Sequence, residues 1–316
     1  MTVQLQDIRA AHDRIRDKIH RTPVMRSASL NDLAGAQLFF KCENLQKAGA
    51  FKTRGAVNAV FGLTEEEARP GVVTHSSGNH AAALARAATL RGIPAHIVMP
   101  KTAPAVKVAS VRRYGGKIVF CEPTLEARES TSQRLISNTG ATFIHPYDDV
   151  RVIAGQGTMA VELLEDIPDL ELILCPVGGG GQLSGVAVAS KGISPKIQVM
   201  AVEPSRADDA ARSFAAGRLI PSVDPRTIAD GLLTSLSDRT FALIQKYVDG
   251  IVTVSEEGIV NAMRTIWEVM KLVVEPSGAV SYAGVIERRV QVKGKRVGII
   301  LSGGNLDLDV LPWQIR

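Results

Sequence analysis

Short apolar runs alternate with amphipathic segments through most of the 316-residue chain. The runs are rich in Val, Ile and Leu and indicate strands at residues 37–45, 72–75, 95–99, 117–121, 170–177, 198–202, 251–254 and 296–301. The segments between them carry apolar residues at helical spacing and indicate helices at 79–91, 104–114, 125–138, 153–165 and 256–271. This alternation predicts an α/β fold with a doubly wound, mainly parallel sheet.

Small and polar residues follow three of the predicted strands directly. Ser-Ser-Gly-Asn-His occupies 76–80, four glycines occupy 178–181, and Ser-Gly-Gly-Asn occupies 302–305. In doubly wound sheets, ligands bind beyond the carboxyl ends of the strands. We therefore expect these three loops, which are far apart in the sequence, to form one shared site.

Three of these predicted strands follow one another after residue 72, and we expect a four-strand unit from about residue 72 to residue 146. We expect a small α/β domain at 71–148, inserted into a large domain made of 1–70 and 149–316.

Composition and charge narrow the class of protein. Apolar residues make up 45% and charged residues 22% of the chain, which is typical of a globular protein. The net charge is +5, but no run of five basic residues occurs, so we expect no nucleic-acid binding. Neither a stretch of about 18 apolar residues nor a signal peptide is present, so we expect no membrane association. Three cysteines, each in an apolar run, indicate reduced thiols and a cytoplasmic protein.

Lys52 and the glycine run suggest complementary chemistry. The neighbours of Lys52 at 50–55 are mostly small or apolar, and burial would lower the lysine pKa towards the neutral amine. Glycines before a helix present main-chain N–H groups to a phosphate. Gln, Leu and Ser at 182–184 do not fit the Gly-x-Gly-x-x-Gly frame of dinucleotide sites. A phosphorylated aldehyde would suit both features, although a solvated lysine and a tight turn are the alternatives.

The segment 76–80 places hydroxyl, amide and imidazole groups at the start of a predicted helix. Hydroxyls and helix N–H groups can hold the α-carboxylate of an amino acid. The alternative is structural, with Ser77 as the helix N-cap and Gly78 as a turn residue.

Four motifs together identify a family resemblance. Phe-Lys-Thr-Arg-Gly-Ala at 51–56 and the loops at 76–80, 178–181 and 302–305 occur in the order and approximate spacing of one enzyme family. The chain resembles the serine/threonine dehydratases and serine racemases, which include 3-hydroxyaspartate dehydratases and are pyridoxal phosphate enzymes of fold type II. The resemblance extends from about residue 20 to the C-terminus.

The resemblance implies a role for each matching position. Lys52 would form the Schiff base with pyridoxal phosphate, and Phe51 and Gly231 would lie against the two faces of its ring. Asn79 would hydrogen-bond the ring hydroxyl, and Ser302 would meet the pyridine nitrogen. The phosphate would be held by Gly178, Gly179, Gly180 and Gly181.

The implied reaction is β-elimination on a small 3-hydroxy amino acid, such as serine, threonine or 3-hydroxyaspartate. Lys52 would remove the Cα proton, and the products would be a 2-oxo or imino acid and ammonia. Ser77 matches the serine of racemases on the opposite face, so a serine or aspartate racemase with incidental elimination is the alternative. The residues expected to contact substrate are Ser76, Ser77, Asn79, His80, Arg128 and Thr234.

Other readings of the site are less favoured. Arg128 could receive a second carboxylate, as in 3-hydroxyaspartate, or be an exposed helix residue. His80 argues against β-replacement, in which a threonine is usual at that position. A phosphate-ligand-binding protein without enzymatic activity is a further alternative.

The resemblance also implies a divalent cation and a partner chain. Glu203, the carbonyl of Ala207, and Asp209 match the cation site of serine racemases, and oxygen ligands suit Mg²⁺, Mn²⁺ or Ca²⁺. Two solvated carboxylates are the structural alternative. We expect a homodimer, and no regulatory domain after residue 305.

Overall fold

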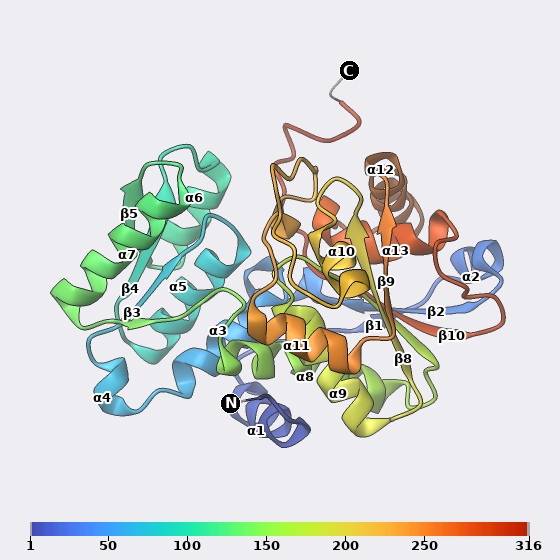
Figure 1. Ribbon diagram of the computed structural model, residues 1–316, viewed down its shortest axis with the longest axis horizontal. Coiled ribbons are helices and arrows are strands. Elements are labelled where there is room, and N and C mark those ends of the chain that lie inside the picture. Colours follow the sequence, from blue (N-terminus) through green and yellow to red (C-terminus); the bar gives the residue numbers. More distant parts are fainter. Residues whose placement is uncertain (1, 315–316) are drawn as a thin grey trace.

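Two β-sheets organise the chain, and the computed structural model describes residues 2–314 of it (Figure 1). The larger sheet has six strands in the order β1-β2-β10-β7-β8-β9, and all neighbours are parallel except β1 and β2. Its strands are β1 (Val24–Met25), β2 (Gln37–Cys42), β10 (Arg296–Leu301), β7 (Leu172–Pro176), β8 (Gln198–Pro204) and β9 (Gly250–Val254).

The smaller sheet, on the left in Figure 1, has four parallel strands in the order β5-β4-β3-β6. They are β5 (Lys117–Cys121), β4 (Ala95–Pro100), β3 (Val72–His75) and β6 (Thr142–Phe143). The predicted α/β fold with a mainly parallel sheet is confirmed. The four-strand unit between residues 72 and 146 has its own sheet, while the expected domain boundaries stay a prediction.

Helices cover both sheets. They are α1 (Leu5–Ile15), α2 (Ala28–Ala34), α3 (Lys52–Phe61), α4 (Glu65–Ala68), α5 (Asn79–Arg91), α6 (Ala105–Arg113), α7 (Leu125–Thr139), α8 (Val150–Asp166), α9 (Gly181–Ile193), α10 (Asp209–Ala216), α11 (Asp238–Tyr247), α12 (Glu256–Thr265) and α13 (Pro276–Ile286). In the described part of the chain, no helix is both long enough and apolar enough to span a lipid bilayer.

Two predicted elements end earlier than the sequence indicates. The strand expected at 37–45 stops at Cys42, because Glu43–Leu45 turns into a 3-10 helix. The helix expected at 256–271 ends as α12 at Thr265 and continues as the π-helix Ile266–Met270. Apolar residues continue at helical spacing across the second change, so the periodicity does not mark it.

The central strand β7 is buried on both faces, as is typical of a parallel sheet covered by helices on both sides. Ile173 and Cys175 pack into the core formed with α1, α8 and α9, whereas Leu172 and Leu174 pack into the core formed with α12 and α13. A strand buried on both faces reads as a continuous apolar run, as residues 172–176 do. The three cysteines are buried and free, as the sequence predicts for reduced thiols.

A buried ion network fixes α3 against the large sheet. The guanidinium of Arg54 donates to both carboxylate oxygens of Glu43, at 2.7 and 2.8 Å, and to both of Glu162, each at 2.7 Å. Lys41 donates to Glu162 at 2.6 Å, so two cations face two carboxylates. All four side chains are at most 2% exposed. Burial would lower the pKa of Arg54, but the adjacent carboxylates raise it above its usual range.

We predict that Glu162→Gln destabilises the protein by about 3–5 kcal/mol, because it leaves the buried Lys41 without the carboxylate that it contacts. The free energy of unfolding is measured by urea denaturation. Glu165→Gln, on the same helix, is the control: its pair with Arg21 is about half exposed, so the change should stay within about 1 kcal/mol. Equal effects of the two substitutions would contradict the prediction.

Candidate active site

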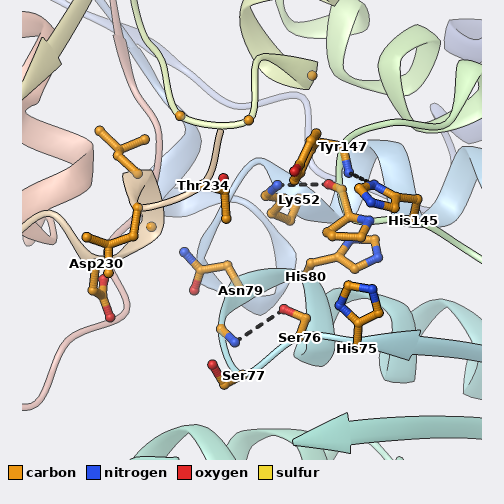
Figure 2. Close-up of a pocket in the computed structure, with 18 of the residues that line it drawn as sticks. Lys52, His75, Ser76, Ser77, Asn79, His80, His145, Tyr147, Asp230 and Thr234 are labelled. Atoms are coloured by element: carbon orange, nitrogen blue, oxygen red, sulfur yellow. Dashed lines mark hydrogen bonds between the residues drawn. The ribbon is translucent and has the colours of Figure 1, made fainter. Parts of the chain in front are cut away.

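The three loops predicted to share a site line one cavity of about 710 Å³ beyond the carboxyl ends of β3, β7 and β10 (Figure 2). The structure thus brings together segments separated by more than 200 residues in the sequence. The sequence-predicted residues on its wall are Phe51, Lys52, Ser76, Ser77, Asn79, His80, Arg128, Gly178, Gly179, Gly180, Gly181, Gly231, Thr234 and Ser302. Glu203, Ala207 and Asp209 are not part of this wall.

Lys52 begins α3 and directs its amine into the cavity (Figure 2). The preceding N–H, of Phe51, donates to the carbonyl of Ser302 at 3.0 Å and ties the start of α3 to the end of β10. The Lys52 amine donates to the carbonyl of Pro146 at 2.9 Å. Burial lowers the pKa of Lys52 to about 8. Near physiological pH, a larger fraction of this amine is therefore neutral than in an exposed lysine.

The four glycines connect β7 to α9 and pack tightly against neighbouring residues. A Cβ on Gly179 would lie 2.6 Å from the ring of Tyr147, and one on Gly181 would lie 2.7 Å from the Tyr147 carbonyl. Gly180 is the N-cap of α9 and has a φ of 84°, which favours glycine. The first N–H groups of a helix have no intrahelical partners, and these lie at the cavity. This arrangement fits an anionic group such as a phosphate.

The start of α5 does not match the structural alternative in which Ser77 is the helix N-cap. The N-cap is Gly78 and not Ser77, and no side chain caps it. Ser76 accepts a hydrogen bond from the N–H of Gly78 at 3.4 Å, and within residues 2–314 the Ser77 hydroxyl makes no hydrogen bond. His80 lies in the first turn, is 2% exposed, and neither ring nitrogen is paired within the same residues. Burial lowers its pKa well below the usual value, so the ring is neutral.

Ser277 links two of the predicted cofactor-binding positions. Its hydroxyl accepts from the N–H of Gly231 at 3.0 Å, and its carbonyl accepts from the hydroxyl of Ser302 at 3.3 Å. Gly231 lies in the 3-10 helix Asp230–Leu232, and Ser302 directly follows β10. These bonds hold both residues at the cavity wall, although sequence motifs did not single out Ser277.

The sequence analysis missed an aromatic wall beside Lys52, formed by His75, Phe143, His145 and Tyr147 (Figure 2). The Nδ1 atom of His145 accepts from the N–H groups of Tyr147 at 3.3 Å and of Asp148 at 2.8 Å, so the ring proton is on Nε2. Burial lowers the pKa of His145 to about 4. His75 directly precedes the 76–80 motif, and this position at a strand end is the signal that could have identified it.

Arg128 and Thr234 reach the cavity from separate parts of the chain. Arg128, on α7, is half-buried and makes no salt bridge to any residue in 2–314. Thr234 lies just after the 3-10 helix Asp230–Leu232. An ion pair between Lys107 and Asp230 connects α6 to the 3-10 helix that precedes Thr234. An unpaired guanidinium at the cavity is suited to bind a carboxylate.

The residues expected to bind a cation lie at the end of β8 and the start of α10. Glu203 accepts from the N–H groups of Ala210 at 3.0 Å and Ala211 at 2.8 Å, while neither oxygen of Asp209 accepts a hydrogen bond in the described part of the chain. Burial raises the pKa of Glu203 to about 8 and that of Asp209 to about 6. No group of three or more His, Cys, Asp or Glu side chains within residues 2–314 is arranged to bind a metal; this set has two carboxylates and the carbonyl of Ala207.

Comparisons with known proteins agree with this geometry. The family model "Pyridoxal-phosphate dependent enzyme" matches residues 15–303. The chain is 52% identical to a beta-hydroxyaspartate dehydratase of Paracoccus denitrificans over 98% of each chain. It is also 52% identical to a serine racemase of Arabidopsis thaliana, over 97% of this chain and 94% of the relative. The solved structure of maize serine racemase matches with a TM-score of 0.96 and 48% identity, over 99% of this chain and 97% of that one.

The residues at the cavity fit the cofactor of this family. An amine with a lowered pKa, glycine N–H groups suited to a phosphate, and hydroxyls at fixed positions are the groups that pyridoxal phosphate requires. The resemblance found in the sequence is confirmed, and the chain belongs to the family of pyridoxal-phosphate dependent enzymes.

Proposed function

We propose that this enzyme is a dehydratase that eliminates the β-hydroxyl of a small 3-hydroxy amino acid and releases a 2-oxo or imino acid and ammonia. The observation that carries the proposal is the lowered pKa of Lys52, about 8, in a cavity whose wall also includes the glycines at 178–181 and the guanidinium of Arg128. The identity to a beta-hydroxyaspartate dehydratase supports the same reaction class.

Residues of three loops would hold the cofactor. Lys52 would bind its aldehyde carbon, residues 178–181 its phosphate, and Asn79 its ring hydroxyl, with Phe51 and Gly231 against the ring. When bound, the cofactor withdraws electrons from the substrate Cα. The hydroxyl of Ser302 would meet the ring nitrogen and, being uncharged, would stabilise a proton there less than a carboxylate would. This favours elimination over reactions that require a long-lived carbanion.

The other residues would orient the substrate. The N–H groups at the start of α5 and the hydroxyl of Ser76 bind the α-carboxylate, with His80 beside them. Lys52, as a neutral amine, takes the Cα proton. The β-hydroxyl then leaves and is protonated to water by the proton taken from Cα, and a second water hydrolyses the resulting imino acid to the 2-oxo acid and ammonia. Arg128 lacks a protein counter-charge and would bind the second carboxylate of 3-hydroxyaspartate, and Thr234 the side-chain end.

A serine or aspartate racemase is the second candidate, and Ser77 is the observation that favours it. Ser77 lines the cavity, and a serine racemase is as similar to this chain as the dehydratase. A serine needs a strongly perturbed environment to act as a base. Within residues 2–314 no histidine or carboxylate hydrogen-bonds to Ser77, so we propose that racemisation is the slower activity.

We also propose that Glu203, the carbonyl of Ala207, and Asp209 bind a divalent cation. The buried Asp209 carboxylate has no partner in the described residues, and burial alone disfavours its charged form. A cation with water ligands would compensate both effects. The homodimer and the cytoplasmic location stay predictions.

We predict that the purified enzyme releases 2-oxo acid and ammonia from at least one of serine, threonine and the 3-hydroxyaspartate stereoisomers. Both products are quantified, and exchange of the Cα proton with deuterium is followed in parallel. The proposal requires elimination to be faster than product-free exchange on the best substrate. Exchange without release of keto acid would instead identify a racemase.

Arg128 and Arg134 both lie on α7, and comparing their alanine variants tests whether Arg128 binds the second carboxylate of the substrate. Arg128→Ala should lower kcat/KM for 3-hydroxyaspartate by about 10- to 100-fold, because a charge-assisted hydrogen bond is lost. Its effect on serine should remain within about threefold. Arg134→Ala, exposed and outside the cavity, should change neither. Equal losses on both substrates would rule out a role of Arg128 in binding the second carboxylate.

We predict that removal of divalent cations by a chelator lowers both the melting temperature and the activity, and that Mg²⁺ restores them. Saturation at about 100 times Kd corresponds to about 2.7 kcal/mol of stabilisation. Asp209→Asn should abolish this response. The adjacent Asp208→Asn, which removes a carboxylate paired with Arg212 at the surface, should retain it. A chelated enzyme with full activity and stability would refute the site.

A further inference from the structure

A chain of hydrogen bonds fixes the orientation of the Asn79 side chain. The carbonyl of Ala48 can only accept, and it accepts from Nδ2 of Asn305 at 2.7 Å. The same Nδ2 donates to Oδ1 of Asn79 at 2.9 Å. Nδ2 of Asn79 therefore faces the other way and donates to Oε1 of Glu275 at 2.7 Å. The direction of the whole chain is determined by one main-chain carbonyl.

One N–H of Asn79 remains available to a ligand. The amide nitrogen carries two hydrogens, and only one of them is used by Glu275. Asn79 and Glu275 both line the cavity, and Asn79 lies between Lys52 and Asp230 in Figure 2. The second hydrogen is therefore held at the cavity by contacts on both sides of the amide.

Glu275 is itself fixed and poorly solvated. Its side chain is 3% exposed, and its N–H donates to the carbonyl of Gly303 at 3.0 Å. Within residues 2–314 it forms no salt bridge; the charged groups that act on it are Asp230 and Lys107, which pair with each other. Burial, with a contribution from Asp230, raises the pKa of Glu275 to about 8. The group is thus largely an uncharged acceptor at neutral pH.

We propose that Glu275 is a positioning residue that, together with Asn305, holds the Asn79 amide so that its free N–H donates to the ring oxygen of the cofactor. The inference rests on the role of Asn79 in the proposed function and extends it to Glu275, which lies outside the sequence motifs, and to Asn305, the last residue of the 302–305 motif. A hydrogen bond donated to the charged form of a group favours that form. An oriented Asn79 amide would therefore keep the ring oxygen deprotonated, and an unrestrained amide would do so less well.

The test uses the visible absorbance of the loaded enzyme as a function of pH, together with the dissociation constant of the cofactor. In Glu275→Leu, the pH at the midpoint of the change in cofactor absorbance should rise by about one unit. The affinity for the cofactor should fall about tenfold. Glu275→Gln keeps an acceptor oxygen and should restore both values to within about threefold of wild type. Asn305→Ala should reproduce the change seen in Glu275→Leu, and combining the two should add little, since both act through one amide.

Further variants separate this role from a structural one. Glu287→Gln alters a half-buried carboxylate that accepts from Ser255 outside the cavity and should leave the spectrum unchanged. A destabilised but spectrally normal Glu275→Leu would overturn the inference, as would a Glu275→Gln enzyme with the defect of the leucine variant. If Glu275→Leu does not fold, Asn305→Ala alone decides the result. If the cofactor absorbance of a Lys52→Ala variant equals that of the wild type, the proposed function itself is overturned.

Discussion

The bidentate contacts of Arg54 with Glu43 and Glu162 are the constraint on which the active site depends. Arg54 lies two residues after Lys52 on α3, so the helix cannot shift without separating buried charges. Glu43 follows β2, and Glu162 lies on α8. The network thus fixes α3 to the carboxyl end of β2 and to α8, and the bond from Phe51 to Ser302 fixes the start of the helix. The position of the Lys52 amine follows from these contacts.

The electrostatics of the cavity follow from burial. Low solvent access moves Lys52, His80, His145 and Glu275 towards their uncharged forms. The positive groups that remain for anions are the guanidinium of Arg128 and the N–H groups at the helix N-termini. A lysine with a lowered pKa beside groups suited to anions is what the proposed abstraction of a Cα proton requires. Burial likewise raises the pKa values of Glu203 and Asp209, the two carboxylates of the proposed cation site outside the cavity.

Much of this arrangement was predictable because it depends on local sequence. Strands buried on both faces are continuous apolar runs, and loops at strand ends carry recognisable small and polar residues. The helix α13 was missed because it is apolar on nearly all sides and shows no helical period. Glu275 and His145 were missed for another reason. The residues that they contact in the site come close only when the chain folds. Asn79 and Glu275 are 196 residues apart in the sequence, and no spacing rule connects them.

The most direct test is to identify the residue that binds the cofactor covalently. The enzyme is loaded with pyridoxal phosphate, reduced with borohydride, digested, and analysed by mass spectrometry. The account predicts a single stoichiometric adduct on the peptide that contains Lys52. An adduct on a different lysine, or no adduct on a fully loaded enzyme, would contradict it.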